Sequence, residues 1–318
     1  MRGRTARQSQ PPLAAEAQRD PSSVSFADTF SRKGRRALDW LTQVAISTER
    51  HAHHPLVMGV VNLTPDSFSD GGRHLAPAAA LSHARQMISD GADILDLGAE
   101  STRPGAEPVS AETELDRLIP LIAAIRAESD IPISVDTMKP QVADAAIAAG
   151  ATLWNDVTAL GHDPNSLQTA ADLGCEVILM HMQGEPRTMQ AEPHYDDVVA
   201  EVTAFLAGRA DAAMAFGVAR DRIWLDPGIG FGKHPIHHNL PLLAGLDRIV
   251  ALGFPVLLGA SRKRFIGMLD GTSTPDQRLG GSIATALAGA AAGVAAVRVH
   301  DVRETVQALT VWAAIRDA

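Results

Sequence analysis

The chain has very little cysteine, few aromatic residues and no long apolar run. Among its 318 residues there is one cysteine, Cys175, and aromatic residues make up 4%. A single cysteine excludes an intramolecular disulfide and fits a reducing, cytoplasmic compartment. No apolar stretch reaches the roughly 20 residues that span a bilayer; the Ala-rich segment Ile283–Val297 comes nearest. The basic N-terminus is not followed by an apolar segment, so we predict neither a secretory signal nor membrane attachment.

The chain also has fewer basic residues, 28 Lys and Arg, than acidic residues, 37 Asp and Glu. The formal net charge is −9 at pH 7, which argues against non-specific binding of nucleic acid. An anionic small molecule is not excluded, because local charge at a site matters more than the sum. With 46% hydrophobic residues, the chain is long enough to bury one large core or two smaller ones. The shortage of aromatics predicts an aliphatic, Ala-rich core.

From Leu56 onward one unit recurs: an apolar strand, a polar or Gly-rich turn, and an Ala-rich helix. The predicted strands are Leu56–Val61, Asp93–Leu97, Ile131–Asp136, Thr152–Asn155, Glu176–His181, Arg222–Asp226, Pro255–Gly259 and Val294–Val299. The predicted helices are Pro77–Ser89, Ala111–Ala127, Pro140–Ala149, Pro164–Leu173, Tyr195–Phe216, Asn239–Ala251, Asp276–Ala292 and Val302–Arg316. Prolines at the starts of three helices and a glycine after most of them support these boundaries.

Eight strand–helix repeats predict a (β/α)8 TIM barrel, whose usual length is about 250 residues. The structural rival is a doubly wound open sheet. That fold commonly carries a Gly-rich phosphate turn after its first strand. The residues that follow the first strand here, Asn62–Asp66, contain no glycine. We therefore assign residues 55–318 to a barrel domain.

Residues 1–54 form an N-terminal extension in this interpretation. Met1–Ser25 has the composition of a disordered segment, and Phe26–Ile46 could form one amphipathic helix. Either a targeting or interaction arm or a simple solvated arm fits this composition. His51, His53 and His54 are spaced like metal ligands, but no acidic residue or cysteine joins them. We predict no metal site there.

Polar residues stand at the carboxyl end of each predicted strand, where packing does not explain them. In a barrel these ends meet at one rim, which is where active sites are built. Helix capping is the simpler alternative and suits Thr137 and Asp163, but it does not explain a polar residue at every strand end. The set is Asn62, Asp96, Asp136, Asn155, Asp156, His181, Asp226, Ser261, Arg262, Lys263, Arg298 and His300.

The chemistry of this set divides in two. Asp136, Asn155 and Asp226 offer acceptors and an amide that can read the edge of a flat heterocycle through charge-assisted hydrogen bonds. The basic set, comprising Lys263, Arg298, His300 and the loop residue Arg103, indicates a phosphate or diphosphate group.

Asn62 offers a neutral oxygen to a hard cation such as Mg²⁺, which takes few protein ligands and keeps waters. Two long polar segments, which follow the first and second strands and include Phe68 and Glu100–Gly105, are expected to close over the ligand.

Eight motifs in order resemble bacterial dihydropteroate synthases. The resemblance covers the chain from about Pro55 to its C-terminus. It implies a TIM barrel, usually homodimeric, that joins (7,8-dihydropterin-6-yl)methyl diphosphate to 4-aminobenzoate. The motifs are MGVVNLTPDSFSDGG (58–72), ESTRPG (100–105), SVDT (134–137), NDV (155–157), MHMQG (180–184), DPGIGFGK (226–233), SRK (261–263) and RVHD (298–301).

The resemblance also assigns roles to individual residues. It implies that Mg²⁺ is held by Asn62 and that Asp136, Lys263, Arg298 and His300 are catalytic. The pterin would lie on Asp136, Asn155, Asp226 and Lys263, with Met180, Met182 and Phe231 as walls. The anion would bind Arg298 and His300. The aminobenzoate site would be shaped by Phe68, Thr102, Arg103, Pro104 and Ser261.

Two other functions stay open from sequence. One is a pterin-binding methyltransferase that acts on methyltetrahydrofolate and a corrinoid protein. It would not need the diphosphate-binding residues Arg298 and His300. The other is a non-catalytic pterin-binding homologue, for which the loss of Asn62 or Lys263 would be expected; both are present.

Overall fold

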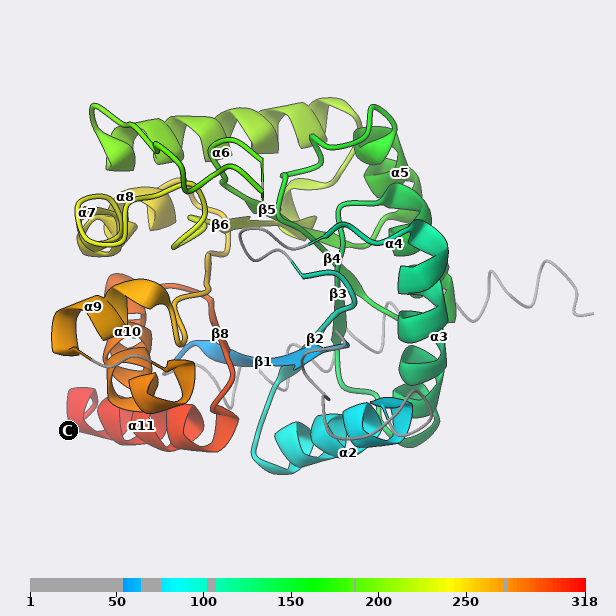
Figure 1. Cartoon of the computed structure of the whole chain (residues 1–318), viewed down its shortest axis with the longest axis horizontal. Coiled ribbons are helices and arrows are strands. Elements are labelled where there is room, and N and C mark those ends of the chain that lie inside the picture. The colour runs from blue at the N-terminus through cyan, green and yellow to red at the C-terminus, as the bar shows by residue number, and fades with distance from the viewer. Residues whose placement is uncertain (1–53, 64–75, 102–106, 186, 272–273) are drawn as a thin grey trace, which may run out of the picture. The chain divides into compact units, whose positions relative to one another are not determined.

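A computed structural model describes residues 54–63, 76–101, 107–185, 187–271 and 274–318. Within them eight parallel strands form one sheet at the centre of the domain, surrounded by helices (Figure 1). The strands are β1 (Leu56–Asn62), β2 (Ile94–Gly98), β3 (Ile133–Asp136), β4 (Leu153–Asp156), β5 (Glu176–Met180), β6 (Ile223–Asp226), β7 (Leu257–Leu258) and β8 (Ala296–Val299).

The sheet has the strand order β6-β5-β4-β3-β2-β1-β8-β7. A single parallel bridge between Leu225 of β6 and Val256, which precedes β7, brings the two edges together. The eight-stranded TIM barrel predicted from the repeats is therefore confirmed, and the open doubly wound sheet is excluded. Strand β7 has two residues where five were predicted. Pro255 has no N–H to donate to a ladder, and Val256 forms only an isolated bridge.

Helices fill the connections between strands. They are α2 (Ala76–Ser89), α3 (Ala111–Glu128), α4 (Pro140–Ala149), α5 (Ser166–Leu173), α6 (Val198–Ala215), α7 (Asn239–Ala244), α8 (Leu246–Val250), α9 (Arg264–Asp270), α10 (Leu279–Ala292) and α11 (Val302–Arg316), with short 3₁₀ helices η2 (Arg220–Arg222) and η3 (Pro275–Arg278). No described helix is long and apolar enough to cross a membrane.

Several predicted helix boundaries were wrong. Helix α6 begins at Val198 rather than Tyr195, because the Asp197 carboxylate caps it by accepting the N–H groups of Val199 and Ala200 at 3.0 Å. Helix α5 begins two residues after Pro164. The predicted helix 239–251 is two helices, which meet at Gly245, and the segment 276–292 starts as η3 and continues as α10. Helices α4 and α11 have the predicted ends.

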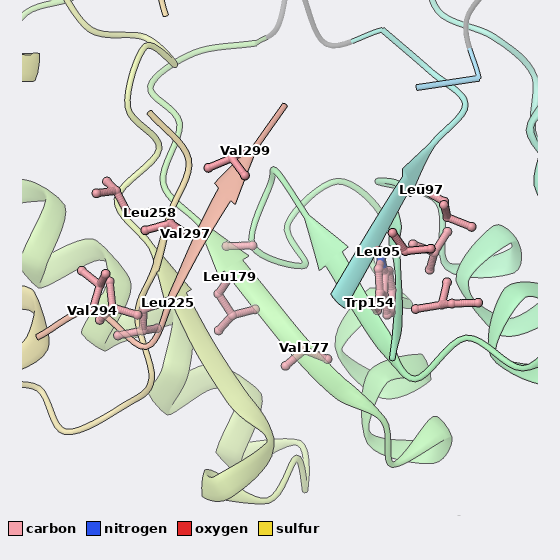
Figure 2. Packing of buried hydrophobic residues seen from close by; sticks show 14 of the residues in the cluster. Leu95, Leu97, Trp154, Val177, Leu179, Leu225, Leu258, Val294, Val297 and Val299 are labelled. Carbon is pink, nitrogen blue, oxygen red and sulfur yellow. The ribbon is translucent and has the colours of Figure 1, made fainter. Parts of the chain in front are cut away.

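The strands explain why the core has two parts. Successive side chains of a strand point to opposite faces, so alternate residues face the helices or the barrel interior. The larger cluster contains outward-facing strand residues such as Leu95, Trp154 and Leu179, packed with helix residues (Figure 2). The interior cluster is small and lies toward the amino ends of the strands. It consists of Met58, Ile94, Leu153, Ile178, Trp224, Leu257 and Ala296.

One carboxyl group lies buried beside this interior cluster. The indole N–H of Trp224 donates to the Glu176 carboxyl at 2.7 Å, and burial raises the pKa of Glu176 to about 7. Because the acid holds its proton more tightly when folded, folding is favoured below the unfolded pKa and loses stability as pH rises from about 4.5 to about 7.

We expect Glu176→Gln to be more stable than the native chain at pH 8 and closely matched to it at pH 5. A glutamine keeps an oxygen for the Trp224 N–H but never ionises. The expected gain at pH 8 is about 2 kcal/mol in the free energy of unfolding. Denaturant unfolding at both pH values measures it. A gain of equal size at pH 5 would show that ionisation of Glu176 is not the cause.

Candidate active site

The alternation that buries apolar residues in the barrel also places the polar ones. In four strands an interior apolar residue is followed two positions later by a polar residue that faces the same interior. The pairs are Ile94 and Asp96, Leu153 and Asn155, Trp224 and Asp226, and Ala296 and Arg298. The interior therefore changes from apolar at the amino ends of the strands to charged at the carboxyl ends.

A cavity of about 660 Å³ opens at the carboxyl ends of the strands. Its size is in the range of small-molecule sites. The predicted site residues that line it come from β1, β3, β4, β6, β8 and the segments after β6, β7 and β8. They are Asn62, Asp136, Asn155, Asp226, Phe231, Ser261, Lys263, Arg298 and His300. Met180 also lines the cavity, whereas Met182, expected beside it, does not.

Arg298 lies between two carboxylates. Its Nε donates to Asp96 at 2.6 Å and one of its terminal nitrogens donates to Asp136 at 3.1 Å. Burial alone would lower the pKa of Arg298, but the two carboxylates outweigh burial and raise it. Burial and the nearby Asp96 raise the pKa of Asp136 to about 7, in spite of the guanidinium. Asp136 is thus a carboxyl group that can change its protonation state near neutral pH.

A second cation and carboxylate, Lys263 and Asp226, also line the cavity. Asp226 is buried, and its Oδ1 accepts the N–H of Gly228 at 2.7 Å, while burial raises its pKa. The Lys263 ammonium lies 4.2 Å from the centre of the Phe231 ring, a cation–π arrangement. Burial and the charge of Arg298 lower the pKa of Lys263 to about 8.

His300 lines the same cavity and contacts Ser261. Burial and the charges of Arg298 and Arg262 lower its pKa to about 3. Its Nδ1 lies 3.1 Å from the Ser261 hydroxyl oxygen, which also accepts the backbone N–H of His300 at 3.3 Å. A neutral imidazole can still donate one hydrogen bond to an anionic ligand, but it adds no charge.

With this geometry established, comparison with known proteins assigns the chain to a family. Residues 58–300 match the family model described as pterin binding enzyme. A dihydropteroate synthase of Escherichia coli strain K12 is 47% identical over 267 residues, covering 84% of this chain and 94% of the relative. One from Neisseria meningitidis serogroup B is 48% identical over 268 residues, covering 82% and 93%.

The chain belongs to the dihydropteroate synthase family. A solved dihydropteroate synthase of Xanthomonas albilineans with 4-aminobenzoic acid has a TM-score of 0.79 and 52% identity. The match covers 83% of this chain and 94% of that structure's chain. A second structure from the same organism, in complex with 7,8-dihydropteroate, has a TM-score of 0.76 and 49% identity, with 83% and 95% coverage. The chain is accordingly a transferase.

Four residues of the predicted dihydropteroate synthase site lie outside the described residues. They are Phe68, Thr102, Arg103 and Pro104. Their predicted roles toward aminobenzoate stay predictions.

Three features of the site were not recognised from sequence. Asp96 was noted at a strand end but given no role, although it is fully buried and holds Arg298; it also accepts weakly from the Asn155 amide at 3.4 Å. Lys233 lies fully buried in the cavity wall, and the signal for it was a lone lysine that ends a Gly-rich motif. The third feature is an ion-pair network beside the second polar segment.

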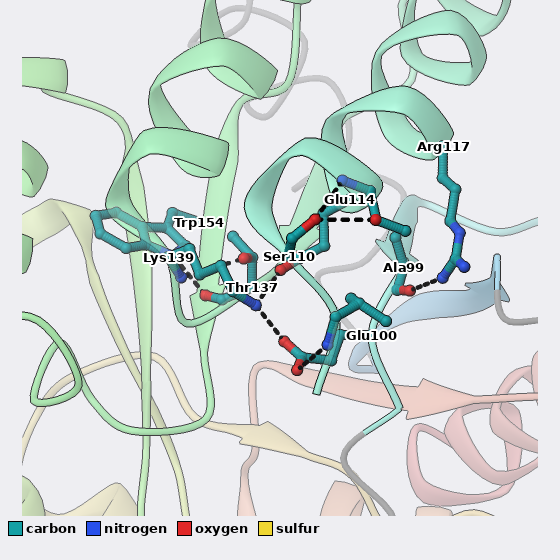
Figure 3. Close-up of polar contacts among 10 residues, drawn as sticks. Ala99, Glu100, Ser110, Glu114, Arg117, Thr137, Lys139 and Trp154 are labelled. Carbon is teal, nitrogen blue, oxygen red and sulfur yellow. Dashed lines mark hydrogen bonds and ion pairs between the residues drawn. The ribbon is translucent and has the colours of Figure 1, made fainter. Parts of the chain in front are cut away.

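That network joins three elements (Figure 3). The Lys139 ammonium contacts Glu100 at 2.6 Å and Glu114 at 2.5 Å, and Glu100 also accepts the N–H of Val109 at 3.2 Å. Arg117 donates to the carbonyl of Ala99 at 2.8 Å. Glu100, which follows β2, therefore holds the backbone at Val109. Lys139, which precedes α4, connects Glu100 to Glu114 of α3. Nothing in the local sequence around Glu114 predicted this contact.

Proposed function

We propose that this chain condenses (7,8-dihydropterin-6-yl)methyl diphosphate with 4-aminobenzoate, giving 7,8-dihydropteroate and diphosphate for folate biosynthesis. The observation that carries the proposal is a cavity lined by carboxylates, an amide and cationic residues. The chain belongs to a family whose solved members hold 4-aminobenzoic acid and 7,8-dihydropteroate. The same comparisons favour this reaction over the methyltransferase alternative, because the curated relatives described above are dihydropteroate synthases.

The pterin ring is assigned to Asp136, Asn155, Asp226 and Lys263. The buried carboxylates can accept paired N–H donors from the ring, and Lys263 and the Asn155 amide can donate to its acceptors. Phe231 and Met180 supply apolar contact for the flat faces. Because the carboxylates lie in a buried site, an unsatisfied ring edge would be costly, which gives selectivity for this heterocycle.

The diphosphate is assigned to Arg298 and His300. Arg298 supplies charge and a planar fork, and neutral His300 supplies a hydrogen-bond donor. Charge that develops on the leaving diphosphate is stabilised by these groups. As it departs, positive charge spreads from the exocyclic carbon into the electron-rich ring, where the Asp136 carboxylate stabilises it. The amino nitrogen of 4-aminobenzoate then forms a bond to that carbon and releases one proton. Ser261, together with the predicted Phe68, Thr102, Arg103 and Pro104, is assigned to the aminobenzoate.

We assign a Mg²⁺ site to Asn62. The residue ends β1, is half-buried and lines the cavity, so its carboxamide oxygen can reach a bound ligand. No cluster of three or more histidine, cysteine or acidic residues suited to a metal occurs among the described residues. A cation held by Asn62, waters and the substrate's diphosphate fits this donor set. Bound there, Mg²⁺ would neutralise charge on the diphosphate.

A homodimer is supported by exposed apolar side chains on neighbouring helices. Met268 and Leu269 of α9 are 49% and 60% exposed, and Val311 and Ile315 of α11 are 54% and 72% exposed. These helices lie on the same side of the barrel, next to α10 (Figure 1). Large exposed apolar residues grouped on one side are typical of an interface. Sedimentation equilibrium of the purified chain tests the proposal.

The catalytic unit is assigned to residues 55–318, which leaves 1–54 as a dispensable extension. We expect a chain that begins at His54 to fold and to keep turnover within about two-fold of the full chain, because the described strands and cavity-lining residues lie after that point. Thermal melting and steady-state kinetics of the two chains measure this. Insolubility or loss of turnover would show that the extension is structural.

The direct test of the function is product formation from the two proposed substrates. Purified chain with pterin diphosphate, 4-aminobenzoate and Mg²⁺ is expected to yield 7,8-dihydropteroate and diphosphate, detected by chromatography. We expect EDTA to abolish turnover and added Mg²⁺ to restore it. Full turnover in the presence of chelator would contradict the proposed Mg²⁺ site at Asn62 but would leave the proposed reaction supported. No product under any condition would overturn the function itself.

A further inference from the structure

Lys233 is fully buried, and the reaction described above gives it no task. Its ammonium nitrogen lies within hydrogen-bond distance of four acceptors. Three are backbone carbonyl oxygens, of Gly228 and Phe231 at 3.0 Å and of His181 at 3.3 Å. The fourth is Nδ1 of His181, at 2.8 Å. An ammonium has three hydrogens and no acceptor, so this carbonyl cage suits a cation at its centre.

The cage joins two stretches of backbone. One is the segment 227–232 after β6, which we name the β6 loop; the other is the backbone that follows β5. They touch so closely that a Cβ at Gly228, where φ is +65°, would lie 1.9 Å from the carbonyl oxygen of His181. A Cβ at Gly232 would lie 2.3 Å from the carbonyl oxygen of Gln183. Glycine at both positions permits the approach. The carbonyl oxygens gathered there repel one another unless a positive charge stands between them.

His181 serves as a neutral acceptor in this arrangement. Burial and the charge of Lys233 lower the pKa of His181 to about 3. Since its Nδ1 faces the ammonium, the ring proton resides on Nε2. The ring is held by an edge contact with Phe205, with centroids 4.8 Å apart. The histidine is therefore a fixed, uncharged partner. Burial lowers the pKa of Lys233 to about 7, while the charge of Asp226 opposes this shift, so the lysine carries the charge of the pair when it is protonated.

The β6 loop presents the apolar wall of the proposed pterin site. Ile229 and Phe231 both line the cavity, and the Lys263 ammonium lies over the Phe231 ring. Further hydrogen bonds reach the loop from outside: Tyr195 donates to the carbonyl of Gly232 at 2.8 Å, and the N–H of Gly230 donates to Asn239 at 2.9 Å. Lys233 differs from these in contacting two carbonyls of the loop and two acceptors of His181 at once.

We propose that Lys233 is a positioning residue, whose ammonium acts as a tethered internal cation that fixes the β6 loop against His181 and thereby sets Phe231 for the pterin ring. This inference rests on the proposed function for the identity of the ligand. The arrangement of the loop itself does not depend on that function, which allows the two to be tested separately.

The first test replaces Lys233 by methionine, which keeps much of the stem and removes the charge. We expect 6-hydroxymethylpterin, a probe without phosphate, to bind at least 10-fold more weakly by calorimetry. We also expect KM for 4-aminobenzoate to change less than two-fold. Tyr195→Phe is the matched control, because it removes one neutral hydrogen bond from the same loop; its expected loss of pterin affinity is about two-fold. Native affinity in Lys233→Met would overturn the proposal.

Chemical rescue separates positioning from a general structural role. In Lys233→Ala, added methylammonium chloride is expected to restore pterin affinity in part, whereas methanol, similar in size but uncharged, is not. Failure of methylammonium to restore affinity to a chain that melts normally would overturn the internal-cation role. If the alanine variant does not fold, Lys233→Met carries the test.

A ligand-free measurement distinguishes failure of this inference from failure of the proposed function. Hydrogen exchange at the amide of Phe231, which bonds to the carbonyl of Gly228 at 3.1 Å, is expected to be at least 10-fold faster in Lys233→Met. This faster exchange would support the positioning role even if the native chain bound no pterin. In that case only the proposed function would be contradicted. Unchanged exchange would overturn the positioning role.

Discussion

Asp226→Asn is expected to weaken binding of 6-hydroxymethylpterin by roughly 30- to 1,000-fold, or about 2–4 kcal/mol. Asp226 is buried at the end of β6, and one of its oxygens is already held by the N–H of Gly228. The proposed ring N–H donors therefore depend on the remaining oxygen and on the negative charge. Asparagine loses the charge and can turn an N–H toward those donors, leaving groups unpaired in a buried site.

Calorimetric titration measures this loss, and Arg103→Ala is the control. Arg103 is predicted to act on the second substrate, so its variant should bind the phosphate-free pterin nearly as the native chain does while turnover falls. Melting curves of both variants detect a loss that arises from unfolding. Equal loss of pterin affinity in the two variants would contradict the separation of the ring site from the aminobenzoate site.

The pH dependence of pterin binding provides a second measure for Asp226. Burial raises the pKa of this carboxyl, so its proton returns at a higher pH than for an exposed aspartate. The native chain should therefore lose pterin affinity as pH falls toward that raised pKa. In Asp226→Asn this part of the acid-side loss should disappear.

Arg298→Met is expected to lower the free energy of unfolding by about 3–5 kcal/mol at pH 8 and to abolish turnover. Arg298 is the cation that contacts both Asp96 and Asp136, and methionine leaves these carboxylates facing each other. The pKa of Asp136, already about 7, should rise further. An acid whose folded pKa is raised favours folding at low pH and loses that contribution as pH rises. The destabilisation should therefore be smaller at pH 6 than at pH 8.

Denaturant unfolding at the two pH values checks this expectation, and two further variants serve as controls. Arg298→Lys keeps a single charge but loses the planar fork, so it should lie between the native chain and Arg298→Met. Adding Asp96→Asn to Arg298→Met removes one of the two repelling charges and should recover part of the stability. Destabilisation that is equal at both pH values would show that lost packing, rather than carboxylate repulsion, is the cause.

Much of the fold could be read from the sequence because it depends on local patterns. Uninterrupted apolar strands, Ala-rich helices and their repetition predict a parallel sheet buried on both faces. The ends of α4 follow from Pro140 and Gly150, where one residue lacks an N–H and the other takes a positive φ of 123°. The start of α6 was misplaced, since several residues near Asp197 could serve as caps and only one does so.

Apart from Met182, the predicted site residues that the structure describes line one cavity, but their contacts with one another were not predicted. Polar residues at strand ends identify Asp136, Asn155 and Asp226, because every second residue of a strand faces the barrel interior and the eight carboxyl ends share one rim. Motif resemblance adds the reaction. Neither indicates which carboxylate pairs with which cation.

Those pairings were decided by tertiary structure alone. Asp96 and Arg298 are separated by 202 positions, yet β2 and β8 flank β1 and bring them to 2.6 Å. His300 is neutral because burial and two nearby guanidinium groups oppose its charge, and Lys233 is caged because two backbone stretches meet around it. Residue type and spacing thus determined the barrel and its polar rim. Distance and burial, which arise only when the strands close, determined the protonation and the partner of each charge.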